Sequence, residues 1–287
     1  MSELYKPVGA VSLDAPAYNY QLRVGIQGMP GSSKTWASTT FPNPVFVSFD
    51  RGLVSHIGRK DIIEIPFYNG QYVDSIVRRS GTAQPPNRKE ALVKFLTTEA
   101  LKLSPEQTLV LDANTGIQTS YHVWWEQNKM TFLTDGGKVD ARKEWSLKLG
   151  FYRELFEYLK ALSCSFIFIY HESPDRNDKG DLNGQVRPLL TGQFQDEVQS
   201  HFTDWYRSVT VEKPKDDAEK DRFKKKFGPD ETLFKEWMKT GTDDTVYLWQ
   251  TQSDSICKCK TSLVAPKYIL ADYSSFQKYK RKISAVV

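Results

Sequence analysis

Short apolar runs alternate along this chain with longer segments of helical spacing. The runs with the character of buried strands are residues 21–27, 45–49, 61–66, 108–112, 165–170 and 203–209. Helical spacing is expected over residues 36–39, 89–103 and 144–162. Apolar strands separated by helices favour an α/β fold with a mainly parallel sheet and helices on both faces. Ligands bind such sheets at the carboxyl ends of the strands.

The remaining segments are more polar. Residues 113–145 are expected to form a long polar and aromatic insertion, and residues 173–188 a loop rich in Gly, Asp and Asn. Residues 212–245 are charge-dense with few apolar anchors, which predicts a helical insertion. Runs at 246–250 and 255–260 are expected to pair as a C-terminal hairpin across Ser253 and Asp254. This divides the chain into an N-terminal arm (1–20), a core (21–211), the charged insertion (212–245) and a hairpin with tail (246–287).

A glycine-containing turn joins the first strand to the first helix, and it carries the pattern of a phosphate-binding P-loop. Backbone N–H groups of such a turn converge on a phosphate, while its lysine reaches the β and γ phosphates and the following hydroxyl holds Mg²⁺. One position departs from the pattern, because Ser33 stands where glycine is usual, and serine fits there if its φ is negative. A plain Gly/Ser turn with a chance lysine is the alternative. The expected nucleotide contacts are Gly28, Pro30, Gly31, Ser32, Ser33, Lys34, Thr35 and Trp36.

Three further polar residues end predicted strands. Asp50 follows the second strand, Asp112 ends the run Thr108–Asp112, and His171 follows the run that ends at Tyr170. Together with Thr35 they are expected at one edge of the sheet. Asp112 has the position of a Walker B acid that binds Mg²⁺ directly or through water. The alternatives are a turn former for Asp50, a helix cap for Asp112 and a surface histidine for His171.

Composition narrows the classes of protein only modestly. The chain has 287 residues, a net charge of +4 and an aromatic share of 13%, which permit a nucleic-acid partner without requiring one. Its three cysteines are predicted to be reduced thiols of a cytoplasmic protein. Cys257 and Cys259 are expected two residues apart on a strand, which is poor geometry for a disulfide between them. No signal peptide or membrane span is expected.

The order of these motifs resembles the RecA-like AAA ATPases of tailed phages, including the phage single-strand-annealing recombination ATPases. The resemblance rests on Gly28–Thr35, residues 46–52, 109–112 and 168–172, and on residues 187–192 with 202–207, and it spans roughly residues 20–210. It implies a RecA-like P-loop core with ATP and Mg²⁺ as cofactors. Lys34, Asp50, Asp112 and His171 would be the catalytic residues, and Thr35 and Asp112 the metal ligands.

Particular roles follow from the same resemblance. Asp50 stands where the family usually has glutamate, as the base that orients the attacking water, and its shorter side chain puts that reach in question. His171 would couple the γ-phosphate to the following loop. Lys258 and Lys260 would reach a neighbouring subunit's γ-phosphate in a ring or filament, a solvated strand face being the alternative.

Single-stranded DNA is the partner that the resemblance implies, through the segments after the Walker B and sensor strands. Basic side chains would hold phosphates, and aromatic rings would stack on bases. Packing of Trp124 and Trp125 beneath the insertion is the alternative for those two residues, and Lys224–Lys226 are expected to be a solvated face. The DNA-binding candidates are Trp124, Trp125, Lys138, Arg142, Lys143, Arg176, Lys179 and Arg187.

The leading hypothesis is therefore an oligomeric phage protein that binds and hydrolyses ATP and acts on single-stranded DNA in recombination or replication. Two rivals stay open. One is a degenerate, non-enzymatic P-loop scaffold, favoured by Ser33 and Asp50; the other is a P-loop kinase for a small acceptor, which would need an arginine-rich lid. ATP turnover with and without DNA separates the three hypotheses.

Overall fold

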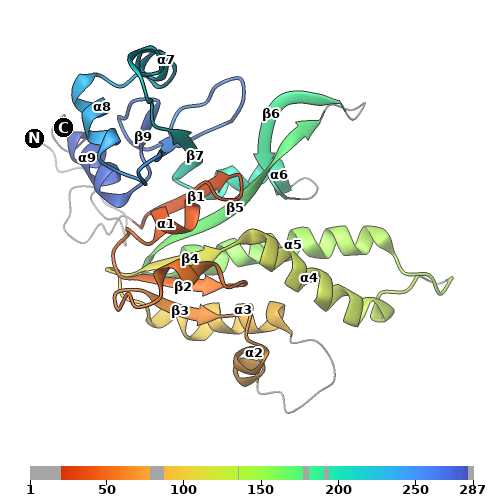
Figure 1. Ribbon diagram of the computed structural model, residues 1–287. Coiled ribbons are helices and arrows are strands. Elements are labelled where there is room, and N and C mark those ends of the chain that lie inside the picture. Colours follow the sequence, from red (N-terminus) through yellow and green to blue (C-terminus); the bar gives the residue numbers. More distant parts are fainter. Residues whose placement is uncertain (1–20, 78–86, 135, 177–180, 191–193, 284–287) are drawn as a thin grey trace, which may run out of the picture.

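A mixed sheet forms the centre of the molecule, as the computed structural model shows for residues 21–77, 87–134, 136–176, 181–190 and 194–283 (Figure 1). Its strand order is β3-β2-β4-β5-β1-β7-β8-β9, and β6 pairs with β5 outside this path. The bounds are β1 (Arg23–Gly28), β2 (Pro44–Ser48), β3 (Ile63–Pro66), β4 (Thr108–Asp112), β5 (Ser165–Arg176), β6 (Leu182–Pro188), β7 (Asp204–Glu212), β8 (Thr245–Gln250) and β9 (Tyr268–Leu270).

Strands β3, β2, β4, β5, β1 and β7 are mutually parallel, so their carboxyl ends meet at one edge. The register sets Gly28 at the end of β1 beside His171 of β5. In the same way, Ser48 at the end of β2 lies beside Asp112 of β4. The predicted α/β fold with a mainly parallel sheet is confirmed. Every predicted core strand is present, although β5 continues past His171 to Arg176.

Helices cover both faces of the sheet, as predicted. Alternate strand residues point to opposite faces: Leu109 and Phe168 join the cluster under α3, α4 and α5, whereas Val110 and Ile169 join the one under α1 and α9. The helix bounds are α1 (Lys34–Ser38), α2 (Gly70–Val77), α3 (Arg88–Thr98), α4 (Asn114–Asn128), α5 (Ala141–Ala161), α6 (Phe194–Glu197), α7 (Asp217–Phe227), α8 (Glu231–Met238) and α9 (Tyr273–Ile283).

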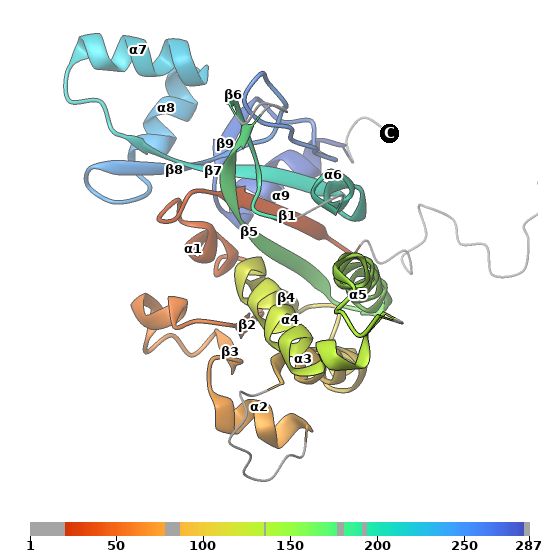
Figure 2. The same cartoon turned by 90° about the vertical axis from the view of Figure 1, so that its right-hand side faces the viewer.

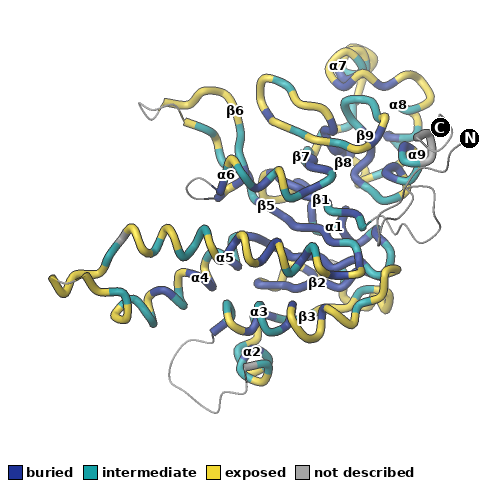
Figure 3. Tube along the Cα trace, turned by 180° about the vertical axis from the view of Figure 1, so that it is seen from behind, coloured by how far each residue is buried: buried dark blue, intermediate teal, exposed yellow. Residues whose placement is uncertain are grey.

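Residues 113–145 are mostly helical, so the prediction of a polar insertion was wrong there. Helix α4 runs to Asn128, a short 3-10 turn follows, and α5 begins after Asp140, whose side chain accepts a hydrogen bond from Arg142 N. The two helices form a hairpin whose tip projects beyond the sheet and is largely exposed (Figure 3). Helix α4 was missed because its buried face includes polar residues, so the apolar residues do not recur with clear helical spacing.

The polar segment 173–188 was also mispredicted as a loop. It forms the far end of β5 and the antiparallel strand β6, in the register Ser173 opposite Arg187. Four residues of this segment, 177–180, lie outside the described residues, as does the expected N-terminal arm 1–20. The β5–β6 hairpin therefore extends from the same edge at which the P-loop lies (Figure 1).

The charged segment 212–245 has more apolar anchors than its composition predicts. Its two helices, α7 and α8, are capped by Asp216 and Asp230, which accept hydrogen bonds from Glu219 N and Leu233 N. Four aromatic residues on these helices are buried against β8 and β9 in a separate small core: Phe223, Phe227, Phe234 and Trp237. The pair lies away from α3, α4 and α5, at the other end of the sheet (Figure 2).

The C-terminal hairpin pairs differently from the prediction. β8 is antiparallel to β7 on one side and to β9 on the other, so residues 255–260 are not its partner. They belong to an irregular loop that is joined to β7 by a bridge between Lys260 and Trp205 and to β6 by a hydrogen bond from Val186 N to Ile256 O. The loop is fastened at buried Asp204, whose carboxylate accepts hydrogen bonds from the backbone N–H and hydroxyl of Ser262. Within the described residues, no helix is both long and apolar enough to cross a membrane.

Candidate nucleotide site

The turn between β1 and α1 has the close packing of a P-loop. A Cβ on Gly28 would lie 2.4 Å from Ser32 Oγ and 2.7 Å from Ser208 O, so only glycine fits there. Gly31 has φ +77°, which also favours glycine. Ser33, however, has φ 62°, so the condition under which serine was expected to fit at this position is not met. A serine therefore stands in the left-handed conformation that glycine adopts without steric cost.

The Lys34 side chain is buried and folded back over the turn. Its Nζ donates hydrogen bonds to Gly28 O (2.9 Å) and Met29 O (2.7 Å). Burial lowers the pKa of Lys34 to about 8, an effect opposed by the nearby carboxylates of Asp112 and Glu172. The ammonium group is thus charged at neutral pH and is held by neutral carbonyl groups, which an anion could replace as its partner.

Thr35 and Asp112 meet across the sheet edge. Thr35 Oγ1 donates a hydrogen bond of 2.8 Å to Asp112 Oδ2, joining the start of α1 to the end of β4. Burial raises the pKa of Asp112 to about 6; the Thr35 hydroxyl and Lys34 oppose this shift, and Asp50 adds to it. A hydroxyl and a carboxylate in contact are the oxygen donors that Mg²⁺ accepts in P-loop proteins.

Asp50 lies next to Asp112 at this edge. Its Oδ1 accepts a hydrogen bond of 2.9 Å from Gly52 N, so the aspartate does form the turn that was considered as its alternative role. A Cβ on Gly52 would lie 3.0 Å from Asp50 Oδ1 and 3.8 Å from Asp112 Oδ2. The two carboxylates thus lie on either side of a small space beside Gly52. This arrangement is compatible with both roles considered for Asp50, forming the turn and orienting a water molecule.

A cavity of about 310 Å³ joins these groups. The predicted residues Pro30, Gly31, Ser32, Ser33, Lys34, Thr35, Trp36, Asp50, Asp112 and His171 all line it. His56, at the end of the 3-10 helix Gly52–His56, also lines it and was missed. Burial, followed by the charge of Arg59, lowers the pKa of His56. No motif marks this histidine in the sequence; only its position shortly after Asp50 could have suggested it.

His171 lies on β5 beside Gly28 and faces the cavity. Burial and then the charge of Lys34 lower its pKa, so the ring is neutral at pH 7. Its Nδ1 is buried and has no hydrogen-bond partner among the described residues. A buried ring nitrogen in this state is available to a bound group in the cavity.

A buried ion pair next to this histidine was missed by the sequence reasoning. Arg207 of β7 donates from Nε to Glu172 Oε2 and from Nη2 to Oε1, both at 2.9 Å. The Glu172 side chain is 2% exposed and that of Arg207 is 19% exposed. The two residues were quoted within the motifs that carry the resemblance, but their pairing becomes visible only once β5 and β7 are known to flank β1.

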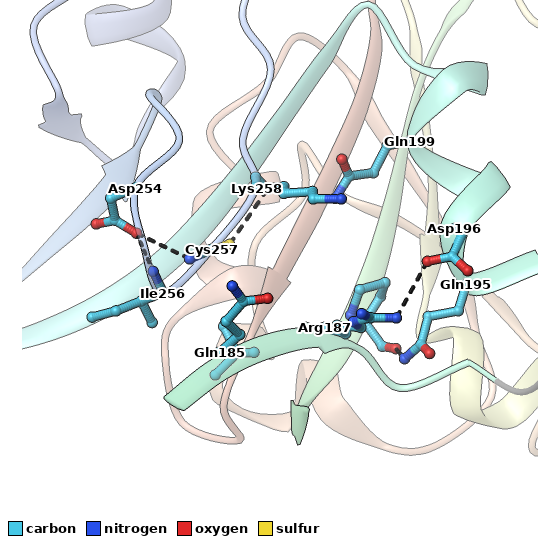
Figure 4. Close-up of a pocket in the computed structure, with 11 residues that line it drawn as sticks. Gln185, Arg187, Gln195, Asp196, Gln199, Asp254, Ile256, Cys257 and Lys258 are labelled. Atoms are coloured by element: carbon cyan, nitrogen blue, oxygen red, sulfur yellow. Dashed lines mark hydrogen bonds and ion pairs between the residues drawn. The ribbon is translucent and has the colours of Figure 1, made fainter. Parts of the chain in front are cut away.

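The two lysines predicted to act on a neighbouring subunit lie in the irregular loop, not on a strand. Lys260 Nζ donates a hydrogen bond of 2.7 Å to Phe202 O within the same chain. Lys258 is exposed and lines a smaller cavity of about 140 Å³, where it points toward Gln199 (Figure 4). Neither lies on the nucleotide cavity of its own chain.

The tryptophan pair predicted for DNA binding lies within α4. Trp125 is 2% exposed and stacks on Phe132, so its ring packs in the core, the alternative given for it above. Trp124 is half-buried, and Lys89 Nζ lies 3.7 Å from the centre of its ring. The exposed tryptophan of this hairpin is Trp145, 51% exposed, which was not singled out in the sequence.

The basic candidates fall into two groups. Lys138, Arg142 and Lys143 are exposed at and beside the tip of the α4–α5 hairpin. On the other hairpin, Arg187 forms ion pairs with Asp175 (3.0 Å) and Asp196 (3.3 Å). Arg176 is exposed at the end of β5, and Lys179 lies outside the described residues. The structure therefore does not bring all candidates into one surface.

Residues 20–226 match the model of a family described as an AAA domain. No curated protein matches the chain. Among solved structures, the chain is similar to the assembled ATPase EscN from the type III secretion system of enteropathogenic E. coli, with 12% identity and a TM-score of 0.35. That likeness covers 66% of this chain and 43% of EscN, so the chain spans less than half of that protein's length.

Proposed function

The chain belongs to the AAA-domain family of P-loop ATPases, and on that premise we propose that it binds and hydrolyses ATP with Mg²⁺ and acts on single-stranded DNA as an oligomer. The observation that carries the nucleotide part is the contact of Thr35 with Asp112 beside the buried ammonium of Lys34, around one cavity. Positive charge, oxygen ligands and free space coincide at the carboxyl edge of a parallel sheet, where ligands of such folds bind.

The residues of the turn suit a nucleotide phosphate. The first intrahelical bond of α1 runs from Ala37 N to Ser33 O, so the N–H groups before it have no acceptor within the helix. Lys34 can exchange its two carbonyl partners for phosphate oxygens. Thr35 and Asp112 would hold Mg²⁺, which neutralises phosphate charge during transfer. Asp50 is the candidate for orienting water, and Ser33 and the short reach of Asp50 lead us to expect slow turnover.

Single-stranded DNA is proposed as the partner on the α4–α5 hairpin. Lys138, Arg142 and Lys143 supply exposed positive charge, and Trp145 supplies an exposed ring close to them in the chain. Phosphate attraction combined with base stacking is how proteins hold single strands. The earlier candidates Trp124, Trp125 and Arg187 support this proposal less, because packing or ion pairs already engage them.

The finer parts of the proposal rest on the order of motifs. A phage-encoded role in recombination or replication, in the cytoplasm of an infected bacterial host, is what the resemblance to phage RecA-like ATPases supports. Assembly into a ring or filament would allow Lys258 or Lys260 to act on a neighbour's nucleotide. For Lys260 this requires that its ammonium leave Phe202 O.

ATP turnover tests the nucleotide part directly. We expect slow Mg²⁺-dependent hydrolysis that single-stranded DNA accelerates and that Lys34→Ala abolishes. Lys89→Ala is a control of matched chemistry, because Lys89 is also a partly buried lysine but lies on α3, outside the cavity. An equal loss of ATP hydrolysis in both variants would show that the substitutions act by destabilising the fold and not through the cavity.

The other outcomes assign the rival functions. Nucleotide binding and self-association without turnover would support the scaffold, and phosphate transfer to a metabolite would support the kinase. Absence of DNA binding at low ionic strength, where phosphate contacts are strongest, would overturn the DNA part. Failure of Mg²⁺–ATP to raise the melting temperature would overturn the nucleotide part.

A further inference from the structure

Two cysteines lie in contact in the irregular loop after β8. Cys257 Sγ and Cys259 Sγ are 3.9 Å apart, although the predicted strand would have separated them. Backbone and side-chain hydrogen bonds wind the loop at this point: Cys257 N donates to Asp254 Oδ1, and Cys259 N donates to Ser253 Oγ, both at 2.9 Å. The third cysteine, Cys164, is buried in the sheet core beside α5.

The two thiols have unequal surroundings. Cys257 is buried, and its sulfur accepts a hydrogen bond of 2.7 Å from Gln27 Nε2 of β1. Cys259 is half-buried, which makes it the thiol that a dissolved reagent reaches first. The contact with Cys259 and burial both raise the pKa of Cys257 above its ordinary value. While both residues are free thiols, Cys257 is therefore the less reactive of the two, and Cys259 reacts first.

Space beside the pair permits movement. A cavity of about 140 Å³ is lined by Ile256, Cys257 and Lys258 on one side and by Gln185 and Arg187 of β6 on the other (Figure 4). A disulfide requires the sulfurs to approach by roughly 2 Å from their present contact. In a fully packed core such a shift would be resisted, whereas a loop that borders a cavity can adjust.

We propose that Cys257 and Cys259 form an oxidisable dithiol site that closes to an intramolecular disulfide, with a low-molecular-weight disulfide such as glutathione disulfide as the oxidant. The site is independent of the proposed ATPase function, since it needs only the two thiols and the oxidant. The neighbouring cavity is lined by charges of both signs, Arg187 and Lys258 with Asp196 and Asp254, so access to Cys259 and not charge determines which thiol the reagent meets.

The chemistry has two exchange steps. The Cys259 thiolate attacks one sulfur of glutathione disulfide; the Cys259–glutathione bond forms, the glutathione S–S bond breaks, and one glutathione thiol leaves with the proton from Cys259. Cys257 then attacks the Cys259 sulfur, and the second glutathione leaves with the proton from Cys257. Two protein thiols are oxidised and one glutathione disulfide is reduced to two glutathione thiols.

The test is native incubation of the full chain with buffers of varied glutathione to glutathione disulfide ratio, followed by acid quenching and mass spectrometry. The wild type is expected to lose two hydrogen atoms, to keep Cys164 as its one alkylatable thiol, and to recover fully with dithiothreitol. Cys257→Ser is expected to stop at one glutathione adduct on Cys259. In that variant the serine hydroxyl can still accept from Gln27, so the fold is retained.

Two matched variants complete the experiment. Cys259→Ser is expected to stay unmodified, because Cys257 is buried, and Cys164→Ser is expected to behave as the wild type. The proposal is overturned if the wild type stops at the Cys259 adduct, as Cys257→Ser does. It is also overturned if the wild type forms only disulfides between chains on a non-reducing gel, or stays reduced at ratios at which Cys257→Ser takes up glutathione.

Discussion

Glu172 and Arg207 form an ion pair across the end of β1, with each guanidinium nitrogen of the contact 2.9 Å from a carboxylate oxygen. One residue lies on β5 and the other on β7, the two strands that flank β1. The pair therefore fastens both neighbours of the strand that leads into the P-loop. Removal of the Glu172 carboxylate would leave the Arg207 guanidinium, whose side chain is only 19% exposed, without its ionic partner. A charge left unpaired in a largely buried position destabilises the folded state.

Glu172→Ala is accordingly expected to lower the free energy of unfolding by about 3 kcal/mol, as measured by urea denaturation. Glu157→Ala is the control, since Glu157 also pairs with a basic residue, Lys160, but is 71% exposed. That exposed pair should contribute little. Similar decreases in the free energy of unfolding of the two variants would show that the Glu172–Arg207 pair contributes no more than an exposed pair.

Ser33→Gly is expected to stabilise the protein by about 1 kcal/mol, because glycine removes the steric cost of a left-handed backbone at φ 62°. Ser33→Ala is the matched control: it keeps the Cβ, and the serine side chain forms no cap hydrogen bond that alanine would lose. Thermal unfolding of the three proteins checks this. A Ser33→Gly protein no more stable than Ser33→Ala would contradict it.

Asp112 is expected to make stability depend on pH. Burial raises its pKa from 3.8 to about 6, so between these values the folded state binds more protons than the unfolded state. This group's contribution to stability therefore falls as pH rises through that window. Asp112→Asn, which can still accept from Thr35, should raise the free energy of unfolding at pH 7 by about 2 kcal/mol.

Urea denaturation at pH 4 and pH 7 without nucleotide checks this prediction, and the advantage of the asparagine variant should be much smaller at pH 4. The same variant should lose Mg²⁺-dependent stabilisation by ATP, because an amide is a weaker Mg²⁺ ligand than a carboxylate. For the wild type, that stabilisation should weaken as pH falls below about 6. If Asp112→Asn raised the free energy of unfolding equally at both pH values, the raised pKa of Asp112 would be refuted as the cause.

Trp145 and Trp125 are expected to respond in opposite ways to alanine substitution. Trp145→Ala should leave stability nearly unchanged and weaken binding of single-stranded DNA by roughly tenfold, since the ring is 51% exposed and Lys148 Nζ, 5.7 Å from its centre, leaves room for a base to stack. Trp125→Ala should cost about 3–5 kcal/mol of stability, because it empties a core position stacked on Phe132. Fluorescence anisotropy with a labelled oligonucleotide and thermal unfolding measure the two effects. Unchanged DNA affinity of Trp145→Ala would remove this tryptophan from the proposed surface.

The parallel part of the sheet was predictable because its strands are short continuous apolar runs. Val110 and Ile167 are buried on one face, while Leu109 and Phe168 are buried on the other, so each strand carries its own signal. The same regularity predicted that Asp50, Asp112 and His171 would meet the P-loop at one edge. These side chains do line one cavity.

The errors arose where contacts between segments, and not the local apolar pattern, decide the structure. The polar segment 173–188 pairs with itself as a hairpin, and helix α4 buries Ile117 and Trp125 against elements that its own sequence does not reveal. Residues 255–260 have alternating character, but β9 takes the position beside β8. Local pattern is a weak guide in such segments, since tertiary contacts override it.

The family match ends at residue 226, inside helix α7, whereas β8 and β9 lie beyond it. A fragment trimmed to that boundary would leave β7 with an unpaired edge and would remove Ser262, which binds the buried carboxylate of Asp204. Exposed strand edges recruit other chains into aggregates. A recombinant fragment that keeps this edge paired therefore extends beyond residue 226, and insolubility of a trimmed version would say nothing about its enzymatic activity.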